Sequence, residues 1–277
     1  MTAESTDTRD GGVTVLESII SGVREDLAQR RAETPLPEIV ARAAAAPPAL
    51  DAHAALLGGR DDAQGVRIIA EVKRSSPSKG ALADIDDPAE LARKYQTGGA
   101  SVISVLTEQR RFRGSLADLE AVRAAVEIPV LRKDFMVDEY QFYEARAHGA
   151  DLVLLIVAAL DDGQLRQFLS LTRDLGMHAL VEAHTEEEIA RAVALGADIV
   201  GVNVRNLKTL GVDPAHYGAM ERHLPDGVVR VAESGVAGPE GVADYARRGA
   251  DAVLVGEALV KNGDPAEELR RFRAAGR

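Results

Sequence analysis

Two residues of opposite charge, Glu71 and Lys73, directly follow a short apolar run in the segment IIAEVKRSSPSKG at 68–80. Successive side chains of a β-strand point to opposite faces, so residues two apart share a face. A carboxylate and an ammonium group on one face can shift each other's pKa and divide proton transfer between them. The pair therefore indicates either a catalytic site at the end of a buried strand or an ordinary ion pair on an exposed edge strand.

Charged or polar residues also end four other apolar runs of the chain. They are Lys133 and Asp134, Glu182, Asn203 and Arg205, and Glu233 with Ser234. Any one of them alone could be a paired charge at the edge of the core. Five runs that all end in such residues indicate one shared acid–base site, provided that the fold brings the ends of the strands together.

A repeat of roughly 50 residues predicts such a fold. Gly-Ala pairs that begin at Gly99, Gly149, Gly196 and Gly249 each end a helical pattern and precede a run rich in Val, Leu and Ile. Such runs are typical of buried parallel strands. A second series of apolar runs begins at 66, 128, 177 and 228. Eight strands that alternate with helices predict a closed (β/α)8 TIM barrel, with an open doubly wound sheet as the alternative.

The segment before the barrel predicts an N-terminal helical extension at about 13–60. Thr14 and Glu17 have the spacing of a capping box, and an apolar helix face follows them. That face consists of Leu16, Ile19, Ile20, Val23 and Leu27. A second helix is expected around 36–46, before two prolines. We expect the extension to cover one end of the barrel, within a single domain at 13–277.

Other local signals place loops and helix ends. Residues 1–12 are predicted to be a disordered tail, and 58–65 a loop. Asp87 is expected to cap a helix that Gly98 closes. Thr185 and Glu188 have the spacing of a second capping box.

The composition restricts the classes of function. The formal net charge of −11 argues against nucleic acid or an anionic membrane as the main partner. The apolar run at 152–160 is too short to span a bilayer, and residues 1–12 lack the features of a signal peptide, which predicts a cytoplasmic protein. The chain has no cysteine, which excludes thiol chemistry and cysteine metal sites. Its histidines lack metal-ligand spacing, so no metal is expected, and His148, His178 and His184 are interpreted as structural.

Two turns that contain glycine predict a site for an anion. The segments ESGV at 233–236 and VGEAL at 255–259 place backbone N–H groups where a ligand can approach. A short helix from Glu257 to Val260 would add its dipole, as in the phosphate sites of TIM barrels, with the Glu257 side chain turned away. A plain tight turn is the alternative. The segment 74–80 is expected to close over the same opening, unless it is a solvated turn.

Six motifs resemble those of the indole-3-glycerol phosphate synthase family. They are EVKRSSPSKG at 71–80, TEQRRFRGS at 107–115, RKDF at 132–135, LVEAH at 180–184, GVNVRNL at 201–207 and AESGV at 232–236. The resemblance runs in order from about residue 13 to 270 and includes the N-terminal helices. It implies a (β/α)8 barrel of tryptophan biosynthesis that converts 1-(2-carboxyphenylamino)-1-deoxyribulose 5-phosphate into indole-3-glycerol phosphate, CO₂ and water. It implies no cofactor and no metal.

The resemblance also implies a role for each matching residue. Lys133 is similar to the general acid that protonates the ketone oxygen, and Lys73 to the group that holds the leaving carboxylate and can donate a proton during dehydration. Glu71 and Glu182 are the implied acid–base carboxylates, and the division of their proton transfers stays open. The implied catalytic set is Glu71, Lys73, Lys133, Glu182, Asn203 and Ser234. The implied substrate-binding residues are Ser76, Phe112, Leu154, Arg205, Leu207, Glu233, Gly235, Gly256 and Glu257.

Within the binding set, three groups of residues have different implied tasks. Asn203 and Glu233 would orient polar groups of the substrate, and Arg205 would hold that polar network. The phosphate turns would be formed by Ser234, Gly235, Gly256 and Glu257, with Ser76 near the substrate on the first loop. The anthranilate pocket would be lined by Phe112, Leu154 and Leu207.

Two other functions are considered, one of a related enzyme and one of a different class. Phosphoribosylanthranilate isomerase is another phosphate-binding barrel, but that family uses a cysteine with an aspartate, and this chain has no cysteine. A binding or scaffold protein could keep the barrel without catalysis. Such a protein needs no proton donor, so Lys73, Lys133 and Glu182 together favour an enzyme. The sequence therefore indicates a phosphorylated small molecule as the ligand, and it gives no protein partner.

Overall fold

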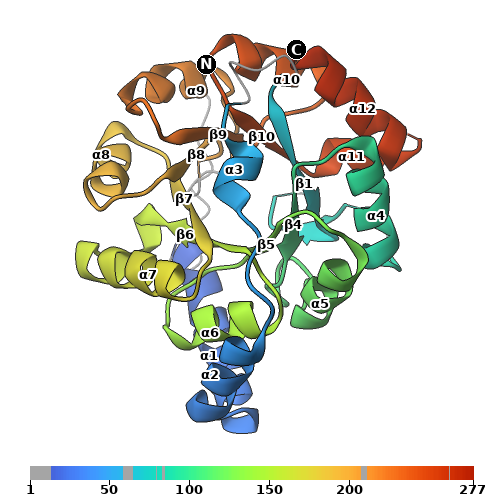
Figure 1. Cartoon of the computed structure of the whole chain (residues 1–277). Helices are drawn as coiled ribbons and strands as arrows, with labels where there is room; N and C mark the ends of the chain where they lie inside the picture. The colour runs from blue at the N-terminus through green and yellow to red at the C-terminus, as the bar shows by residue number, and fades with distance from the viewer. Residues whose placement is uncertain (1–13, 59–64, 79, 83–84, 207–210, 262) are drawn as a thin grey trace, which may run out of the picture.

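Eight parallel strands form a closed barrel in the computed structural model of the chain (Figure 1). The structure describes residues 14–58, 65–78, 80–82, 85–206, 211–261 and 263–277. The barrel strands are β1 (Arg67–Val72), β4 (Val102–Leu106), β5 (Val130–Lys133), β6 (Leu152–Ile156), β7 (His178–Ala183), β8 (Ile199–Asn203), β9 (Val229–Glu233) and β10 (Ala252–Val255). Strand β1 pairs with β4 on one side and β10 on the other, which closes the ring. The TIM-barrel prediction is therefore confirmed, and the open sheet is excluded.

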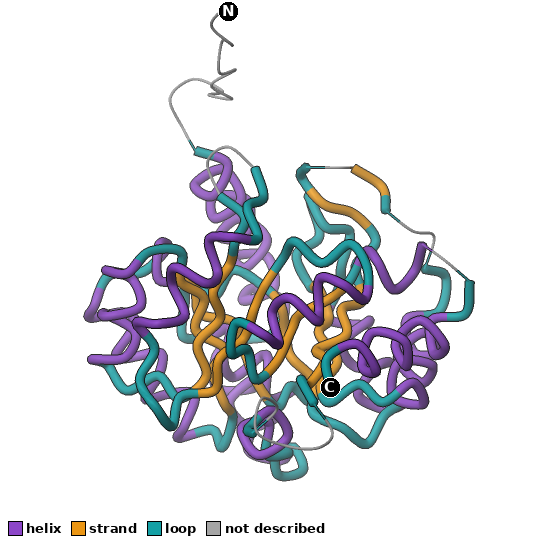
Figure 2. The backbone as a smooth tube through the Cα atoms, turned by 90° about the horizontal axis from the view of Figure 1, so that it is seen from above, coloured by secondary structure: helices purple, strands orange, loops and turns teal. Residues whose placement is uncertain are grey.

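Helices follow the strands and form an outer layer around them (Figure 2). They are α4 (Pro88–Gly98), α5 (Leu116–Ala125), α6 (Tyr140–Ala147), α7 (Asp162–Asp174), α8 (Glu186–Ala194), α9 (Ala215–Met220), α10 (Pro239–Arg247), α11 (Glu257–Lys261) and α12 (Pro265–Ala275), with 3₁₀ turns at Val157–Ala159 and Glu221–His223. No helix among the described residues is both long and apolar enough to cross a membrane. The short helix expected after the last strand is present as α11.

Alternation along each strand divides the core into two parts. Residues such as Ile68 and Ala70 of β1 belong to the layer that packs against the helices. Ile69 of β1 and Leu131 of β5 belong to a second cluster, which fills the inside of the barrel. The inward face of β1 continues from Ile69 to Glu71, two residues later, so the barrel interior passes directly from apolar packing to charge.

The N-terminal extension contains three helices, α1 (Val15–Glu33), α2 (Leu36–Ala45) and α3 (Ala52–Leu56). The capping box of Thr14 and Glu17 is present at the start of α1. Ile19 and Val23 of α1 pack against Val137, which follows β5 at the C-terminal end of the barrel. Helix α2 lies against α6.

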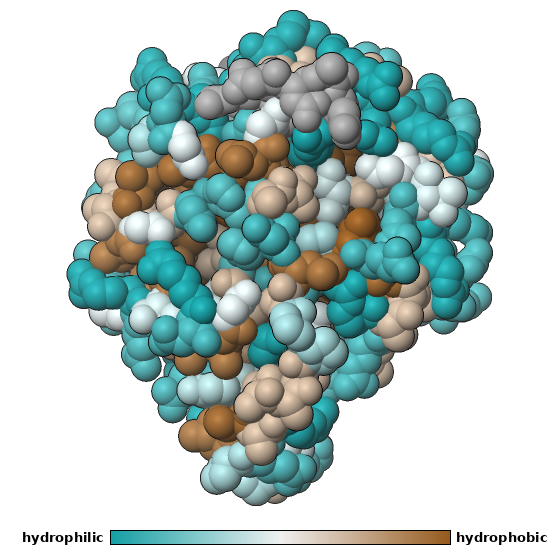
Figure 3. All heavy atoms as spheres, in the orientation of Figure 1, coloured by the Kyte–Doolittle hydropathy of each residue, from teal (hydrophilic) through white to brown (hydrophobic). Residues whose placement is uncertain are grey.

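Helix α3, which the sequence did not predict, lies at the opposite end of the barrel. Ala52 and Leu56 are fully buried and pack with the interior cluster of the strands. Figure 1 looks onto α3 across the barrel opening, and Figure 3 shows that end covered by side chains. The extension therefore contacts both ends of the barrel rather than one.

Two predicted helix ends differ in detail. Helix α4 ends at Gly98, but its C-cap is Gly99, which adopts the left-handed conformation with φ 96°. The Thr185 side chain accepts a hydrogen bond from the backbone N–H of Glu188 as expected. The Glu188 side chain, however, does not accept one from the backbone N–H of Thr185. Its carboxylate accepts the N–H of His184 at 2.6 Å instead. The prediction of a second capping box was therefore wrong, because the Glu188 carboxylate accepts the backbone N–H of His184 instead of that of Thr185. The predicted tail at 1–12 and most of the loop at 58–65 lie outside the described residues.

The burial of α3 gives a test by substitution. Leu56→Ala should lower the free energy of unfolding by about 2–5 kcal/mol, because it leaves a cavity at the end of the barrel that α3 covers. Leu57→Ala, one residue later and 46% exposed, should change it by less than about 0.5 kcal/mol. Chemical denaturation of both variants measures the difference. Equal effects at the two positions would contradict the packing of α3 against the strands.

Candidate active site

The inward faces of five strands bring charged and polar side chains to one pocket at the C-terminal end of the barrel. Leu180 and Glu182 of β7 share the inward face, as do Val231 and Glu233 of β9. Fourteen of the fifteen residues expected at the site line this pocket: Glu71, Lys73, Ser76, Phe112, Lys133, Leu154, Glu182, Asn203, Arg205, Glu233, Ser234, Gly235, Gly256 and Glu257. Leu207 lies outside the described residues.

Lys133 stands between two buried carboxylates. Its Nζ lies 3.8 Å from Oε2 of Glu182 and 3.5 Å from Oε2 of Glu233. Burial by itself lowers the pKa of Lys133, but the negative charges of Glu233, Glu182 and Glu71 outweigh burial and hold that pKa above its usual range. Lys133 is therefore a charged ammonium group, which has a proton to donate.

Glu71 and Lys73 form an ion pair with each other in the pocket. Oε2 of Glu71 also accepts a hydrogen bond of 3.4 Å from Ser104 Oγ on β4. Burial raises the pKa of Glu71, but the charges of Lys73 and Lys133 and these hydrogen bonds outweigh it, so the pKa lies below the usual range. Glu71 and Lys73 are thus a pair within the pocket, with Glu71 buried and Lys73 partly exposed. The exposed-edge alternative is excluded because β1 has a neighbouring strand on each side.

Glu233 differs from Glu71 in its charge state. Burial and the neighbouring Glu182 raise the pKa of Glu233 to about 8, against the lowering effect of Lys133. A glycine on β8 makes room for this carboxyl group, because a Cβ at Gly201 would lie 2.0 Å from Oε1 of Glu233. The pocket therefore holds one carboxyl group that keeps its proton near neutral pH.

The two predicted anion turns lie at the ends of β9 and β10. Ser234 and Gly235 both have positive φ, 71° and 76°, and the Ser234 carbonyl accepts a hydrogen bond of 3.0 Å from Tyr245 Oη. A left-handed serine is uncommon and marks a backbone held by its surroundings. After β10, the Glu257 side chain pairs with Lys261 along α11, although Glu257 also lines the pocket.

The loop after β1 carries a short hairpin of β2 (Ser75–Ser76) and β3 (Gly80–Ala81), which the sequence did not predict. Arg205 reaches this loop from the end of β8, with Nη1 3.4 Å from Ser78 Oγ, and its backbone N–H bonds Asn203 Oδ1 at 3.0 Å. In Figure 2 the hairpin and α1 stand at the same end of the barrel. The loop and α1 therefore both border the pocket, as the residues of its wall confirm.

Some residues of the pocket wall were missed, and one charged candidate has another task. Val15, Leu16 and Ile19 of α1 line the pocket, whereas the sequence predicted only that the extension covers one end of the barrel. Phe135 lies 6.1 Å from Phe112, ring centre to ring centre. Asp134 also lines the pocket, but its carboxylate accepts hydrogen bonds from two buried groups, Arg132 Nη2 at 3.0 Å and Thr107 Oγ1 at 2.6 Å. Among the described residues, no group of His, Asp and Glu side chains is arranged to hold a metal ion.

Comparisons of the sequence with known proteins decide the family. The model of the family "Indole-3-glycerol phosphate synthase" matches residues 16–272. The chain belongs to the indole-3-glycerol phosphate synthase family. The indole-3-glycerol phosphate synthase of Micrococcus luteus is 67% identical, over 95% of this chain and 98% of its own. That of Paenarthrobacter aurescens strain TC1 is 61% identical, over 95% of this chain and 97% of its own.

Solved structures outside the family share the fold. A 3-hexulose-6-phosphate synthase from Salmonella typhimurium superposes with a TM-score of 0.63 at 17% identity, and the match covers 76% of this chain and 98% of that one. At this identity the likeness concerns the barrel alone. The chemistry of an indole-3-glycerol phosphate synthase has to be read from the pocket.

The raised pKa of Glu233 predicts a pH-dependent contribution to stability. An acid whose pKa is higher in the folded state stabilises that state most below the unfolded pKa, and this contribution is lost as pH rises through the folded pKa of about 8. Glu233→Gln removes the loss, so its melting temperature relative to the unsubstituted protein should rise between pH 5 and pH 9. Glu187→Gln, at an exposed position of α8, should show no such trend. A melting-temperature difference that is constant with pH for Glu233→Gln would contradict the shift.

Proposed function

We propose that Lys133 is the general acid of the indole-3-glycerol phosphate synthase reaction in this chain. In that reaction an aromatic carbon attacks the ketone carbon of the sugar chain, the ring carboxylate leaves as CO₂, and the new hydroxyl group leaves as water. The attack places negative charge on the ketone oxygen, which then needs a proton. The observation that supports Lys133 is its buried ammonium group between Glu182 and Glu233. Such a group holds a proton to donate, and the protonated carboxyl group of Glu233 beside it can replace that proton.

The other charges of the pocket divide the remaining tasks. Lys73, at the mouth end of β1, binds the carboxylate that leaves as CO₂. Glu71 and Glu182 exchange the protons of the dehydration, while Asn203 and Glu233 orient polar groups of the substrate. Phe112, Leu154 and Phe135 contribute apolar surface for the aromatic ring. The net charge of −11 supports the further proposal that neither nucleic acid nor an anionic membrane is the main partner, and we propose that the enzyme is cytoplasmic.

The substrate phosphate binds at the turns after β9 and β10. Backbone N–H groups of Ser234, Gly235, Gly256 and Glu257 donate to its oxygens, and the left-handed conformations of Ser234 and Gly235 favour such a concave backbone. The guanidinium of Arg205 and the hairpin loop border the same side of the pocket.

Replacement of Lys133 tests its assignment as the acid. Lys133→Met should lower kcat by about 10²–10⁴-fold, because a positioned acid contributes that much. Lys94→Met, on α4 outside the pocket and with a side chain that is 44% exposed, should leave kcat unchanged. The fluorescence of the indole product gives the rate, and the absence of tryptophan from the chain keeps background emission low. Near-normal turnover by Lys133→Met would remove it from the mechanism.

Replacement of Gly235 tests the phosphate turns. Gly235→Asp should raise KM strongly, because a Cβ there would lie 2.8 Å from Tyr245 Oη and displace the turn, which loses hydrogen bonds to a charged group worth about 1.5–3 kcal/mol each. Inorganic phosphate should inhibit the unsubstituted enzyme competitively and inhibit this variant much less. Gly176→Asp is the matched control, because Gly176 also has positive φ, 72°, but lies in open space. Equal inhibition of the Gly235 and Gly176 variants would place the anion elsewhere.

A further inference from the structure

One histidine that the sequence had suggested to be structural lies between two carboxylates at the edge of the pocket. His184 directly follows β7, and its Nε2 lies 3.7 Å from Oε1 of Glu182. Its Nδ1 lies 3.3 Å from Oε2 of Glu188 on α8. The imidazole therefore links a carboxylate of the helix layer with a carboxylate of the pocket.

Three contacts fix the position of His184. Its backbone N–H donates to Oε2 of Glu188 at 2.6 Å, the same oxygen that its ring contacts. Its carbonyl lies 2.7 Å from Nε2 of His216 on α9. Nε2 of His184 is itself buried and has no hydrogen-bond partner among the described residues, so its contact with Glu182 is an ion pair rather than a hydrogen bond.

The geometry determines the charge of the ring. A neutral imidazole has one N–H donor and one nitrogen lone pair, whereas an ionised carboxylate only accepts. Because both ring nitrogens of His184 face carboxylates, a neutral ring would point a lone pair at one of them. The imidazolium, with two N–H groups, suits both. Burial lowers the pKa of His184, but Glu188, Glu182 and Glu233 outweigh it and raise the pKa above its usual value.

The charge on His184 makes Glu182 and Glu233 unequal. Glu182 has two cationic groups within 4 Å, Lys133 at 3.8 Å and His184 at 3.7 Å. Among the described residues, Glu233 has only Lys133 at such a distance, 3.5 Å. When two buried carboxyl groups lie together, the proton stays on the one with fewer cations around it.

We infer that His184 is a positioning residue whose imidazolium holds Glu182 in its ionised form and leaves the shared proton on Glu233. Glu188 acts through His184, since it fixes the ring and balances its charge. This inference rests on the proposed acid–base role of Glu182. A purely structural His184 would only join the end of β7 to the start of α8, and its loss would affect stability alone.

Replacement of His184 by asparagine separates these two roles. The asparagine amide can still donate to Glu188 in place of Nδ1, but nothing replaces Nε2 beside Glu182. His184→Asn should lower kcat by about 10-fold, a part of the roughly 10²–10⁴-fold that a positioned acid or base contributes, with KM changed less than about 2-fold. The ratio of unsubstituted to variant kcat should fall as pH rises, because the unsubstituted enzyme then loses its own imidazolium.

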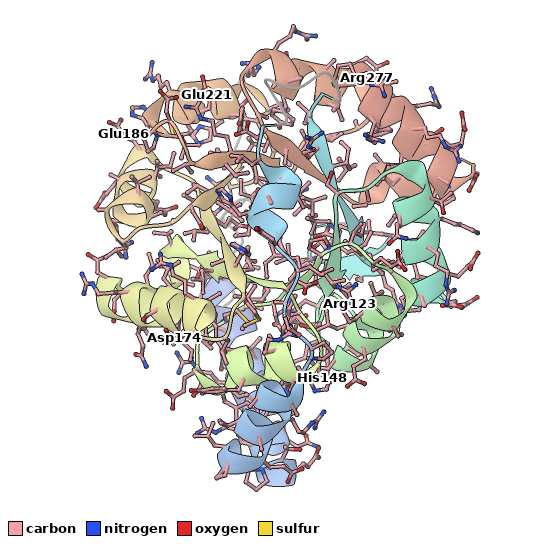
Figure 4. The ribbon with its side chains drawn as sticks, viewed as in Figure 1. Arg123, His148, Asp174, Glu186, Glu221 and Arg277 are labelled. Carbon is pink, nitrogen blue, oxygen red and sulfur yellow. The ribbon has the colours of Figure 1, made fainter. Side chains whose placement is uncertain are left out.

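His148 offers a matched control. Its side chain is 14% exposed, the same fraction as that of His184, and its Nδ1 lies 2.8 Å from Glu120. It follows α6 on the outside of the barrel, where Figure 4 labels it, away from the pocket. His148→Asn should therefore change the melting temperature without changing kcat or its dependence on pH.

Two further variants complete the test. Glu188→Gln should also lower kcat. The double variant should lose no more kcat than His184→Asn alone, because Glu188 acts through the His184 ring. Additive losses, or a kcat ratio for His184→Asn that does not vary with pH, would overturn the inference. If His184→Asn does not fold, the kcat of Glu188→Gln and its pH dependence decide alone. An unchanged kcat for Glu188→Gln would also overturn it.

Glu182→Gln distinguishes this inference from the function on which it rests. A loss of about 100-fold or more in kcat for Glu182→Gln, with a normal His184→Asn, would overturn the role of His184 only. Normal turnover by Glu182→Gln would overturn the proposed role of Glu182, and the inference with it.

Discussion

The burial of three carboxylates around one ammonium group is the constraint on which the site depends. Glu71, Glu182 and Glu233 are each at most 3% exposed, and all three act on the charge of Lys133. Burial of an unpaired charge costs several kcal/mol, so these groups can share a pocket only as a set. The set is balanced because Lys73 pairs with Glu71, and Glu233 takes a proton. The same balance of charges therefore allows these groups to be buried together and gives the pocket its acid–base capacity.

The barrel supplies that arrangement through the alternation of its strands. The inward side chains are apolar along most of each strand, and near the C-terminal end of several strands the next inward residue is charged. Two glycines make the close approach possible: a Cβ at Gly201 would meet Glu233, and one at Gly256 would lie 3.0 Å from Oε1 of Glu71. Because glycine has no side chain, these two positions leave room for the carboxyl groups without a wider barrel.

The strands and the rim residues could be predicted from the sequence because both follow simple periods. Buried runs recur after each Gly-Ala pair, and residues two apart share a face, which placed Glu71 with Lys73 correctly. Helix α3 was missed because five residues are too few to show a helical period. The place of the His184 ring between Glu182 and Glu188 could not be predicted, because only the folded chain brings these groups together. The unequal surroundings of Glu182 and Glu233 likewise depend on distances across strands, which no local pattern encodes.

The position of α3 has a consequence for synthesis on the ribosome. Ala52 and Leu56 emerge before any barrel strand, yet the cluster that buries them includes Ala252 of β10. Until the last strand is in place, these apolar side chains lack part of their final surroundings. Contacts so distant in sequence form late, after a costly loop closure. A nascent chain that ends before β10 therefore exposes apolar surface from its first sixty residues, and chaperones that recognise such surface would meet it there.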